Sequence, residues 1–191
     1  MDLTNLIDSV KNKKTRLSTL SIKRAINIAI AEGSPELAYE LACIVDNGVI
    51  KNVEKLRKDL EIVVIKSKNP EFAYLYARDI PGANINVLEK VVLEAKNPYY
   101  SCEFASDIPN ANIDKHQNVV INSKDAQTAY RFALYVEKAD IKTLENIVIK
   151  SQDAKLIFNF RENIEYANVK KLNLALERIK NNINFDKNLE L

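Results

Sequence analysis

The single histidine of this 191-residue chain, His116, is the side chain best suited to acid–base chemistry near neutral pH. A general base must lie within hydrogen-bond reach of the proton that it takes. Asp107 and Asp114 are close to it in sequence, but no nucleophile accompanies them. The matching positions of other segments are all leucine: Leu60, Leu88, Leu144 and Leu172. We therefore expect His116 to be a partly buried packing residue, and the sequence predicts no catalytic site and no enzyme.

Cysteine and glycine usage bears on metals and cofactors. The two cysteines, Cys43 and Cys102, match no metal-ligand spacing even when His116 is included. The common nucleotide-binding, zinc-protease and hydrolase motifs are missing, and three glycines are too few for phosphate-cradling loops. We expect the cysteines to pack as small apolar residues. The sequence predicts no metal, no cofactor and no small-molecule substrate.

A basic stretch near the N-terminus is the strongest charge feature. No acidic residue occurs between Asp8 and Glu32. The basic residues of this stretch are Lys11, Lys13, Lys14, Arg16, Lys23 and Arg24. They could bind nucleic-acid phosphates, or they could surround the first helix as a solvated loop. The net charge of +2 is too near neutral for a general polyanion binder, so nucleic-acid binding is our alternative hypothesis.

A repeat of 28 residues provides the elements that would position any site. Four copies follow one another without a gap, at 63–90, 91–118, 119–146 and 147–174. Self-similarity at such a period indicates a solenoid of stacked units. Apolar residues at helical spacing in 85–95, and again after 97, predict two short helices per copy. We predict an all-α fold: a right-handed α/α solenoid of about five two-helix repeats with helical caps.

Capping residues mark where the helices begin. We call the helix expected over 85–95 and its counterparts the first helices, and the helix expected after 97 and its counterparts the second helices. The positions expected to cap the first helices are Asn84, Asn112, Asp140 and Asn168, with Ser21 further back. The second helix is expected to begin after Asn69, Asn97, Asp125 and Asp153, with Ser34 one copy earlier. Proline should stop this second helix at Pro81 and Pro109. This recurrent punctuation excludes a continuous coiled coil, which a 28-residue period would otherwise allow.

Small and aromatic residues recur in the second helix at positions that we expect to form the core. The small column is Ala77, Ala105 and Ala133. One aromatic column is Tyr74, Tyr130 and Phe158, and the other is Tyr76, Phe104, Phe132 and Phe160. A stripe that recurs in every copy is typical of packing between stacked helices.

The outward positions of the second helix differ from copy to copy. A constant core beneath a variable surface is typical of repeat proteins that bind a partner. Tyrosine and arginine are the residue types that dominate binding energy at protein interfaces. The candidate protein-binding residues are Tyr99, Glu103, Arg131, Tyr135 and Arg78.

We expect one helical-repeat domain over 1–191, with a capping helix and basic loop at 1–20, repeats over 21–182 and a tail at 183–191. Seven extra residues separate Pro35 from Pro70, and we expect a longer loop at 46–48 and a longer helix at about 52–66. Arg161 and Glu177 replace small or apolar residues, which predicts a C-terminal cap over 154–182.

The segments NPEFAYLYARDIPGANINVLEKVV and DAQTAYRFALYVEKADIKTLENIV resemble tandem two-helix repeats in proteins of bacteriophages and AT-rich bacteria. The resemblance covers about residues 21–180, and is more distant to HEAT and tetratricopeptide repeats. It implies a fold and no specific activity, and a phage protein of this kind would be expected to bind and modulate a host protein. No apolar run approaches the ~20 residues of a membrane span. We therefore predict a cytoplasmic, non-enzymatic protein-binding scaffold whose partner is another protein.

Overall fold

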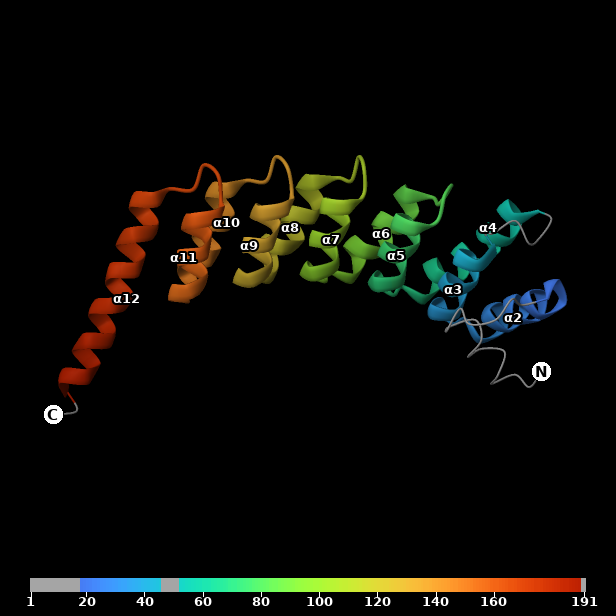
Figure 1. The fold of residues 1–191 in the computed structure, drawn as a ribbon, viewed down its shortest axis with the longest axis horizontal. Helices are drawn as coiled ribbons and strands as arrows, with labels where there is room; N and C mark the ends of the chain where they lie inside the picture. Colours follow the sequence, from blue (N-terminus) through green and yellow to red (C-terminus); the bar gives the residue numbers. More distant parts are fainter. Residues whose placement is uncertain (1–17, 46–51, 190–191) are drawn as a thin grey trace. The chain divides into compact units, whose positions relative to one another are not determined.

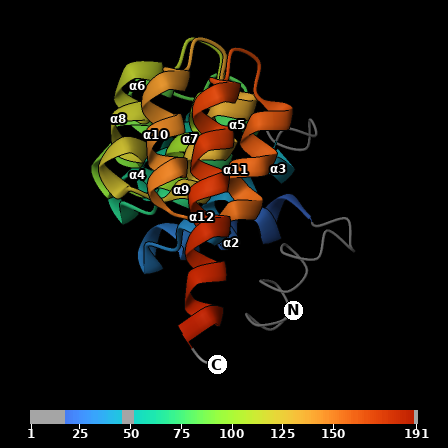
Figure 2. The same cartoon turned by 90° about the vertical axis from the view of Figure 1, so that its left-hand side faces the viewer.

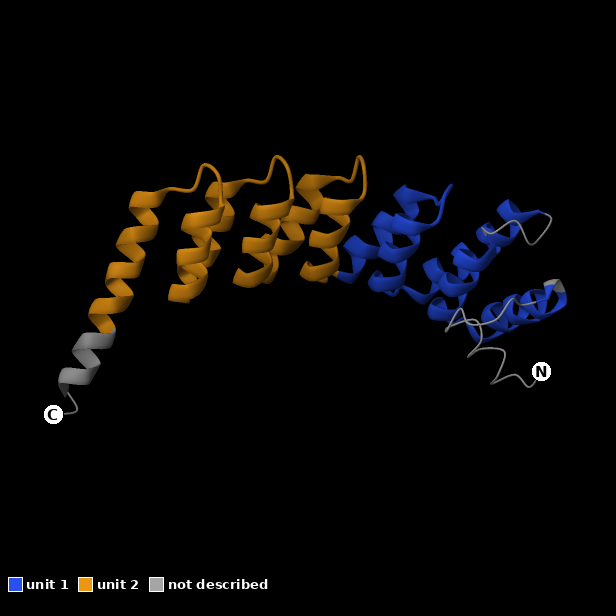
Figure 3. Cartoon of the chain, viewed as in Figure 1, with its two compact units in different colours: residues 1–95 blue, residues 96–191 orange. Residues whose placement is uncertain are grey.

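The computed structural model describes residues 18–45 and 52–189, without the side chains of Thr19 and 183–189. Within these ranges it contains eleven α-helices and no strand, so the predicted all-α fold is confirmed (Figure 1). Neighbouring helix pairs pack in series, as expected for α/α repeats. The chain divides into two compact units, Met1–Ala95 and Lys96–Leu191 (Figure 3).

The first unit contains five described helices. They are α2 (Thr19–Glu32), α3 (Pro35–Val45), α4 (Val53–Ser67), α5 (Pro70–Asp79) and α6 (Ile85–Ala95). Each helix packs on the next, α4 also packs on α2 and α6, and α3 on α5. The predicted lengthening around 52–66 is confirmed, because α4 has 15 residues where α6 has 11. The expected loop at 46–48 and residues 1–17 of the predicted N-terminal cap lie outside the described residues.

The second unit repeats the same arrangement. Its helices are α7 (Pro98–Asp107), α8 (Ile113–Ser123), α9 (Ala126–Tyr135), α10 (Ile141–Lys150), α11 (Ala154–Asn163) and α12 (Val169–Leu189). Helices α8 and α10 form one layer, which we call layer A, and helices α7, α9 and α11 form layer B (Figure 2). The last helix, α12, packs on α11 and continues through the segment predicted to be a tail from 183. That boundary was wrong because no proline or glycine follows 168 to end the helix.

Most predicted caps are confirmed. Side-chain oxygens of Asn112, Asp140 and Asn168 accept backbone N–H groups three residues later, at 3.1–3.2 Å. The caps of the second helices do the same or bond two residues on, at Asn69, Asn97, Asp125, Asp153 and Ser34. The prediction for Ser21 was wrong. Helix α2 begins one residue after Ser18, whose hydroxyl accepts the Ser21 N–H at 3.1 Å, so Ser21 lies in the first turn.

Turns between helices use left-handed backbone at residues other than glycine. Lys68, Lys96, Lys124 and Gln152 follow the first helices of their repeats with φ of 52–57°. Gly33, at the matching turn after α2, has φ 64°. Left-handed backbone costs an L-residue roughly 1–2 kcal/mol relative to glycine, so these turns depend on the packing of the helices that they join.

Buried residues end the second helices. Helices α9 and α11 end at the same register as α5 and α7, although they lack the prolines of 81 and 109. The following residue is extended and at most 6% exposed in all four repeats: Ile80, Ile108, Val136 and Ile164. Burial of this side chain therefore ends the helix even where proline is missing.

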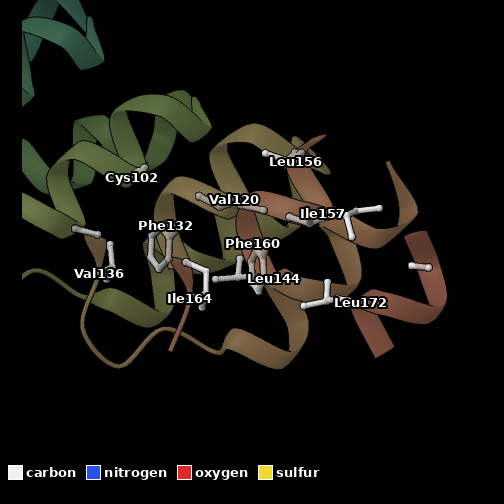
Figure 4. Close-up of a cluster of buried hydrophobic side chains, with 14 residues drawn as sticks. Cys102, Val120, Phe132, Val136, Leu144, Leu156, Ile157, Phe160, Ile164 and Leu172 are labelled. Atoms are coloured by element: carbon white, nitrogen blue, oxygen red, sulfur yellow. The ribbon is translucent and has the colours of Figure 1, made fainter. Parts of the chain in front are cut away.

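The predicted core is largely confirmed. Tyr76, Phe104, Phe132 and Phe160 are at most 1% exposed, and Figure 4 shows the last two within the cluster of the second unit. Ala77 and Ala105 are buried, and Ala133 is half-buried. In the other aromatic column Tyr74 is buried and Tyr130 half-buried, but Phe158 is 47% exposed and was wrongly placed in the core. Phe158 lies on α11, beyond which no described helix continues layer B, and the Arg161 guanidinium covers its ring at 4.6 Å.

Side-chain hydrogen bonds that no sequence pattern predicted join successive first helices. The side chain of Glu61 accepts the backbone N–H of Asn84 at 2.6 Å. In the second unit, Gln117 and Glu145 accept the N–H groups of Asp140 and Asn168 at 2.6 and 2.7 Å. These acceptors occupy one column of the repeat, and each holds the start of the next helix in register.

Candidate functional site

Three of the five candidate residues meet on the surface of layer B. Asn97 caps α7 by accepting the N–H groups of Tyr99 and Tyr100, which places Tyr99 in the first helical turn. Glu103 follows one turn later. Arg131, on α9, bonds the Glu103 carboxylate at 2.5 Å and lies 5.2 Å from the centre of the Tyr99 ring. The two charged residues are 28 positions apart, so the repeat itself brings them side by side.

The Tyr99 ring is held from two sides and remains available to solvent. Its second neighbour is Tyr100, whose ring meets it edge to face at 5.1 Å between centroids. Tyr99 is 44% exposed, while the side chains of Arg131 and Glu103 are 36% and 20% exposed. A cation over one face and a ring against the edge restrict the tyrosine before any partner arrives.

The charge of Arg131 is balanced within this group. Burial acts to lower the pKa of Arg131, but the charge of Glu103, together with Cys102, Tyr99 and the hydrogen bond to Glu103, raises it above its ordinary value. Beneath them, burial raises the pKa of the Cys102 thiol to about 12. Cys102 is 1% exposed and is a packing residue, as the sequence predicted.

Tyr135 and Leu134 extend the surface by one turn of α9. Tyr135 is 60% exposed and Leu134 is 37% exposed. Tyr135 also lines a cavity of about 430 Å³ together with Ser106 and Ile108 of the preceding repeat. The exposed Tyr135 ring could contact a partner directly, and the adjacent cavity could accept one of the partner's side chains. We call Tyr99, Glu103, Arg131, Leu134 and Tyr135 the α7–α9 surface.

Arg78, the fifth candidate, belongs to the first unit. Its guanidinium bonds Asp79 at 2.8 Å and the Tyr74 hydroxyl at 3.0 Å, and lies 5.1 Å from the Tyr74 ring centre. The hydrogen bond to Asp79 raises the pKa of Arg78 above its ordinary value. Asp79 also accepts the Tyr39 hydroxyl at 2.6 Å, so Arg78 is part of a network that joins α3 to α5.

The basic residues of the alternative hypothesis are only partly described. Lys23 and Arg24 are exposed on α2. Lys11, Lys13, Lys14 and Arg16 lie outside the described residues.

His116 lies in the interior. It is 0% exposed and its ring stacks on Phe104 at 5.1 Å with an interplanar angle of 25°. It is thus more deeply buried than the partial burial expected. Within 18–45 and 52–189, no three His, Cys, Asp or Glu side chains are grouped so as to hold a metal ion. None of the helices in the described part of the chain is both long and apolar enough to cross a membrane.

Comparisons with protein-family models, with curated proteins and with solved structures find no match to this chain.

Proposed function

We propose that this chain is a non-enzymatic helical-repeat scaffold that binds another protein through the α7–α9 surface. The observation that carries the proposal is the fixed, half-exposed Tyr99 ring beside the exposed Tyr135 and Leu134. Tyrosine offers a large contact area at a low cost in conformational entropy. A ring restrained by Arg131 and Tyr100 loses still less freedom on binding.

The charge pattern indicates what kind of partner would fit. Arg131 is paired with Glu103, so the surface carries no unbalanced charge next to Tyr99. A partner patch with apolar and hydrogen-bonding groups therefore suits it better than a strongly charged one. The tyrosine hydroxyls would provide hydrogen bonds at the edge of such a contact.

Burial of His116 supports a non-enzymatic role, because a fully buried imidazole stacked on Phe104 cannot reach a substrate at the surface. We also propose the cytoplasm as its compartment, in keeping with the free thiol of Cys102, which serves as a packing residue.

Site-specific photocrosslinking tests the proposal. A photoreactive phenylalanine analogue is placed at Tyr99 or Tyr135, and at Tyr166 as a control that is 86% exposed elsewhere in the same unit. In extracts of the source cells, we expect one protein to crosslink from positions 99 and 135 and not from 166. The same protein should be lost from affinity capture with Tyr99→Ala/Tyr135→Ala and retained with Tyr166→Ala. Equal crosslinking from all three positions, or equal capture by both variants, contradicts the proposal.

A further inference from the structure

A groove on the opposite layer of the second unit carries a different set of side chains. It lies between α8 and α10 and encloses about 570 Å³. Ile121 and Ile147, both half-buried on the core, provide its apolar lining. Lys124, Lys150, Asn122 and Asn146 provide its polar lining.

The positive charge of this groove is not balanced. No acidic residue lines it. Lys124 and Lys150 are exposed, and neither forms an ion pair within the described parts of the chain. Arg131, by contrast, is paired with Glu103. A bound anion would therefore balance the positive charge of Lys124 and Lys150.

The polar lining of the groove includes side chains that can donate hydrogen bonds. The Lys171 ammonium donates to Asn146 Oδ1 at 2.6 Å and to Glu145 Oε1 at 2.7 Å. The Asn146 side chain, which lines the groove, also carries two amide N–H donors. The Thr143 hydroxyl, also in the lining, already donates to its cap residue Asp140. The available polar groups are thus two ammonium groups and amide donors, which suit carboxylate or phosphate oxygens.

The apolar lining separates these two ligand classes. Proteins that bind single-stranded nucleic acid stack its bases on aromatic rings, and no aromatic residue lines this groove. Isoleucine side chains instead suit aliphatic side chains of a peptide. We propose that the α8–α10 groove binds an acidic segment of a partner protein, with apolar side chains on Ile121 and Ile147 and carboxylates at Lys124 and Lys150.

The positions of the two lysines also have a structural consequence. Lys124 is the C-cap residue of α8 and Lys150 the last residue of α10, where the helix dipole favours a cation. A purely structural role requires no ligand, so binding is the property that distinguishes the two roles.

The groove proposal goes beyond the proposed function and uses none of its residues. Tyr99→Ala/Tyr135→Ala should leave binding to the groove unchanged. Substitution of the two groove lysines should leave crosslinking from position 99 unchanged. Failure of one proposal is therefore distinguishable from failure of the other.

Selection from a displayed library of random linear peptides tests the groove. The baits are the full-length protein and its Lys124→Glu/Lys150→Glu variant. We expect peptides retained by the first bait and lost by the second to be enriched in both acidic and aliphatic residues. Their affinity, measured with synthetic peptides, should fall about tenfold or more in the variant. It should also fall when salt is raised from about 0.05 to about 0.5 M.

Lys138→Glu/Lys155→Glu is the matched control. It makes the same change in net charge within the same unit. Lys138, like Lys124, has left-handed backbone (φ 64° and 57°), and Lys155, like Lys150, is an exposed helical residue. This variant should retain the selected peptides, and circular dichroism should show all proteins folded.

Three results would overturn the groove proposal. The first is a selection in which no peptide depends on the groove lysines. The second is enrichment of acidic residues without aliphatic ones, which would indicate general polyanion attraction. The third is a fluorescent oligonucleotide that binds the protein more tightly than the selected peptides and is lost in Lys124→Glu/Lys150→Glu, which would assign the groove to nucleic acid.

Discussion

The α7–α9 surface and the α8–α10 groove belong to the same unit and the same repeats, but they handle charge in opposite ways. On layer B, the Arg131 guanidinium is neutralised by Glu103 and restrains an exposed tyrosine. On layer A, Lys124 and Lys150 form no ion pair with any of the residues that the structure describes, and they border a groove lined in part by Ile121 and Ile147. The same repeats therefore present a restrained, charge-balanced surface on layer B and a basic surface on layer A, because each layer consists of different helices and exposes its own side chains.

The largest expected effect comes from filling the contact between helices of layer B. Ala105→Leu adds three carbon atoms at a position of α7 where the native alanine is only 7% exposed. Overpacking should lower the free energy of unfolding by about 1–3 kcal/mol in a denaturant titration. Because α7 would shift against α9, partner binding by the α7–α9 surface should weaken more than peptide binding by the groove. Ser106→Leu, at the exposed neighbouring position, is the control for stability alone, and an equal loss of unfolding free energy there would contradict the assigned register.

The corresponding change beneath layer A is Glu145→Ala. Glu145 has 3% side-chain exposure and bonds both Lys171 and the backbone N–H of Asn168. Its loss leaves that N–H without its acceptor and should cost about 1–2 kcal/mol of unfolding free energy. Binding through Tyr99 should be retained, because Glu145 lies on α10 and outside the α7–α9 surface. Glu177→Ala, at an exposed helical site, should cost almost nothing.

Alkaline pH should weaken the second unit through Cys102. Burial raises the pKa of this thiol from 9.0 to about 12, so its neutral form is favoured in the folded chain. The stabilisation is present below the unfolded-state pKa and is lost as pH rises from 9 toward 12. At pH 10 the loss should be about 1 kcal/mol. Cys102→Ala should remove this part of the pH dependence in paired denaturant titrations, and an unchanged slope would contradict the assignment. Cys43→Ala is the matched control.

His116→Leu should be neutral or stabilise the chain by up to about 1 kcal/mol. It replaces the buried imidazole with an apolar side chain, leucine, which is the residue found at the matching positions of other repeats. Thermal unfolding measures the change. A loss above about 2 kcal/mol would show that the imidazole makes a hydrogen bond that the fold requires.

The smallest effect on stability is expected from Tyr99→Ala, which should change the free energy of unfolding by no more than about 0.5 kcal/mol. Its ring is 44% exposed and packs mainly on Arg131 and Tyr100. The same variant should strongly weaken capture of the crosslinked partner. If Tyr99→Ala proves more destabilising than Ala105→Leu, Tyr99 is a packing residue and the α7–α9 surface loses its anchor.

The candidate site was only partly predictable from the sequence. Glu103 and Arg131 could be paired because they occupy the same repeat position with opposite charges. The edge contact between Tyr99 and Tyr100 could not, because it depends on side-chain conformations at the start of α7. Arg78 shares the residue type of Arg131, but its partners lie on its own helix.

The α8–α10 groove carried no sequence signal that distinguished it from ordinary solvated helix surfaces. Lysines at helix ends are common, and nothing local shows whether a carboxylate will reach them. Only the folded chain shows that Glu145 pairs with Lys171.

The sequence by itself determined the repeat, the helix starts and the main core columns. Capping and helical periodicity are local properties, so Asn97 or Asp125 predicts a helix start without knowledge of the rest of the fold. Tertiary structure alone decided where α9 and α11 end, why Phe158 is exposed, and which side chain holds Asn168 in register. Those features depend on burial against neighbouring helices and on contacts between residues more than 20 positions apart, which no short sequence pattern contains.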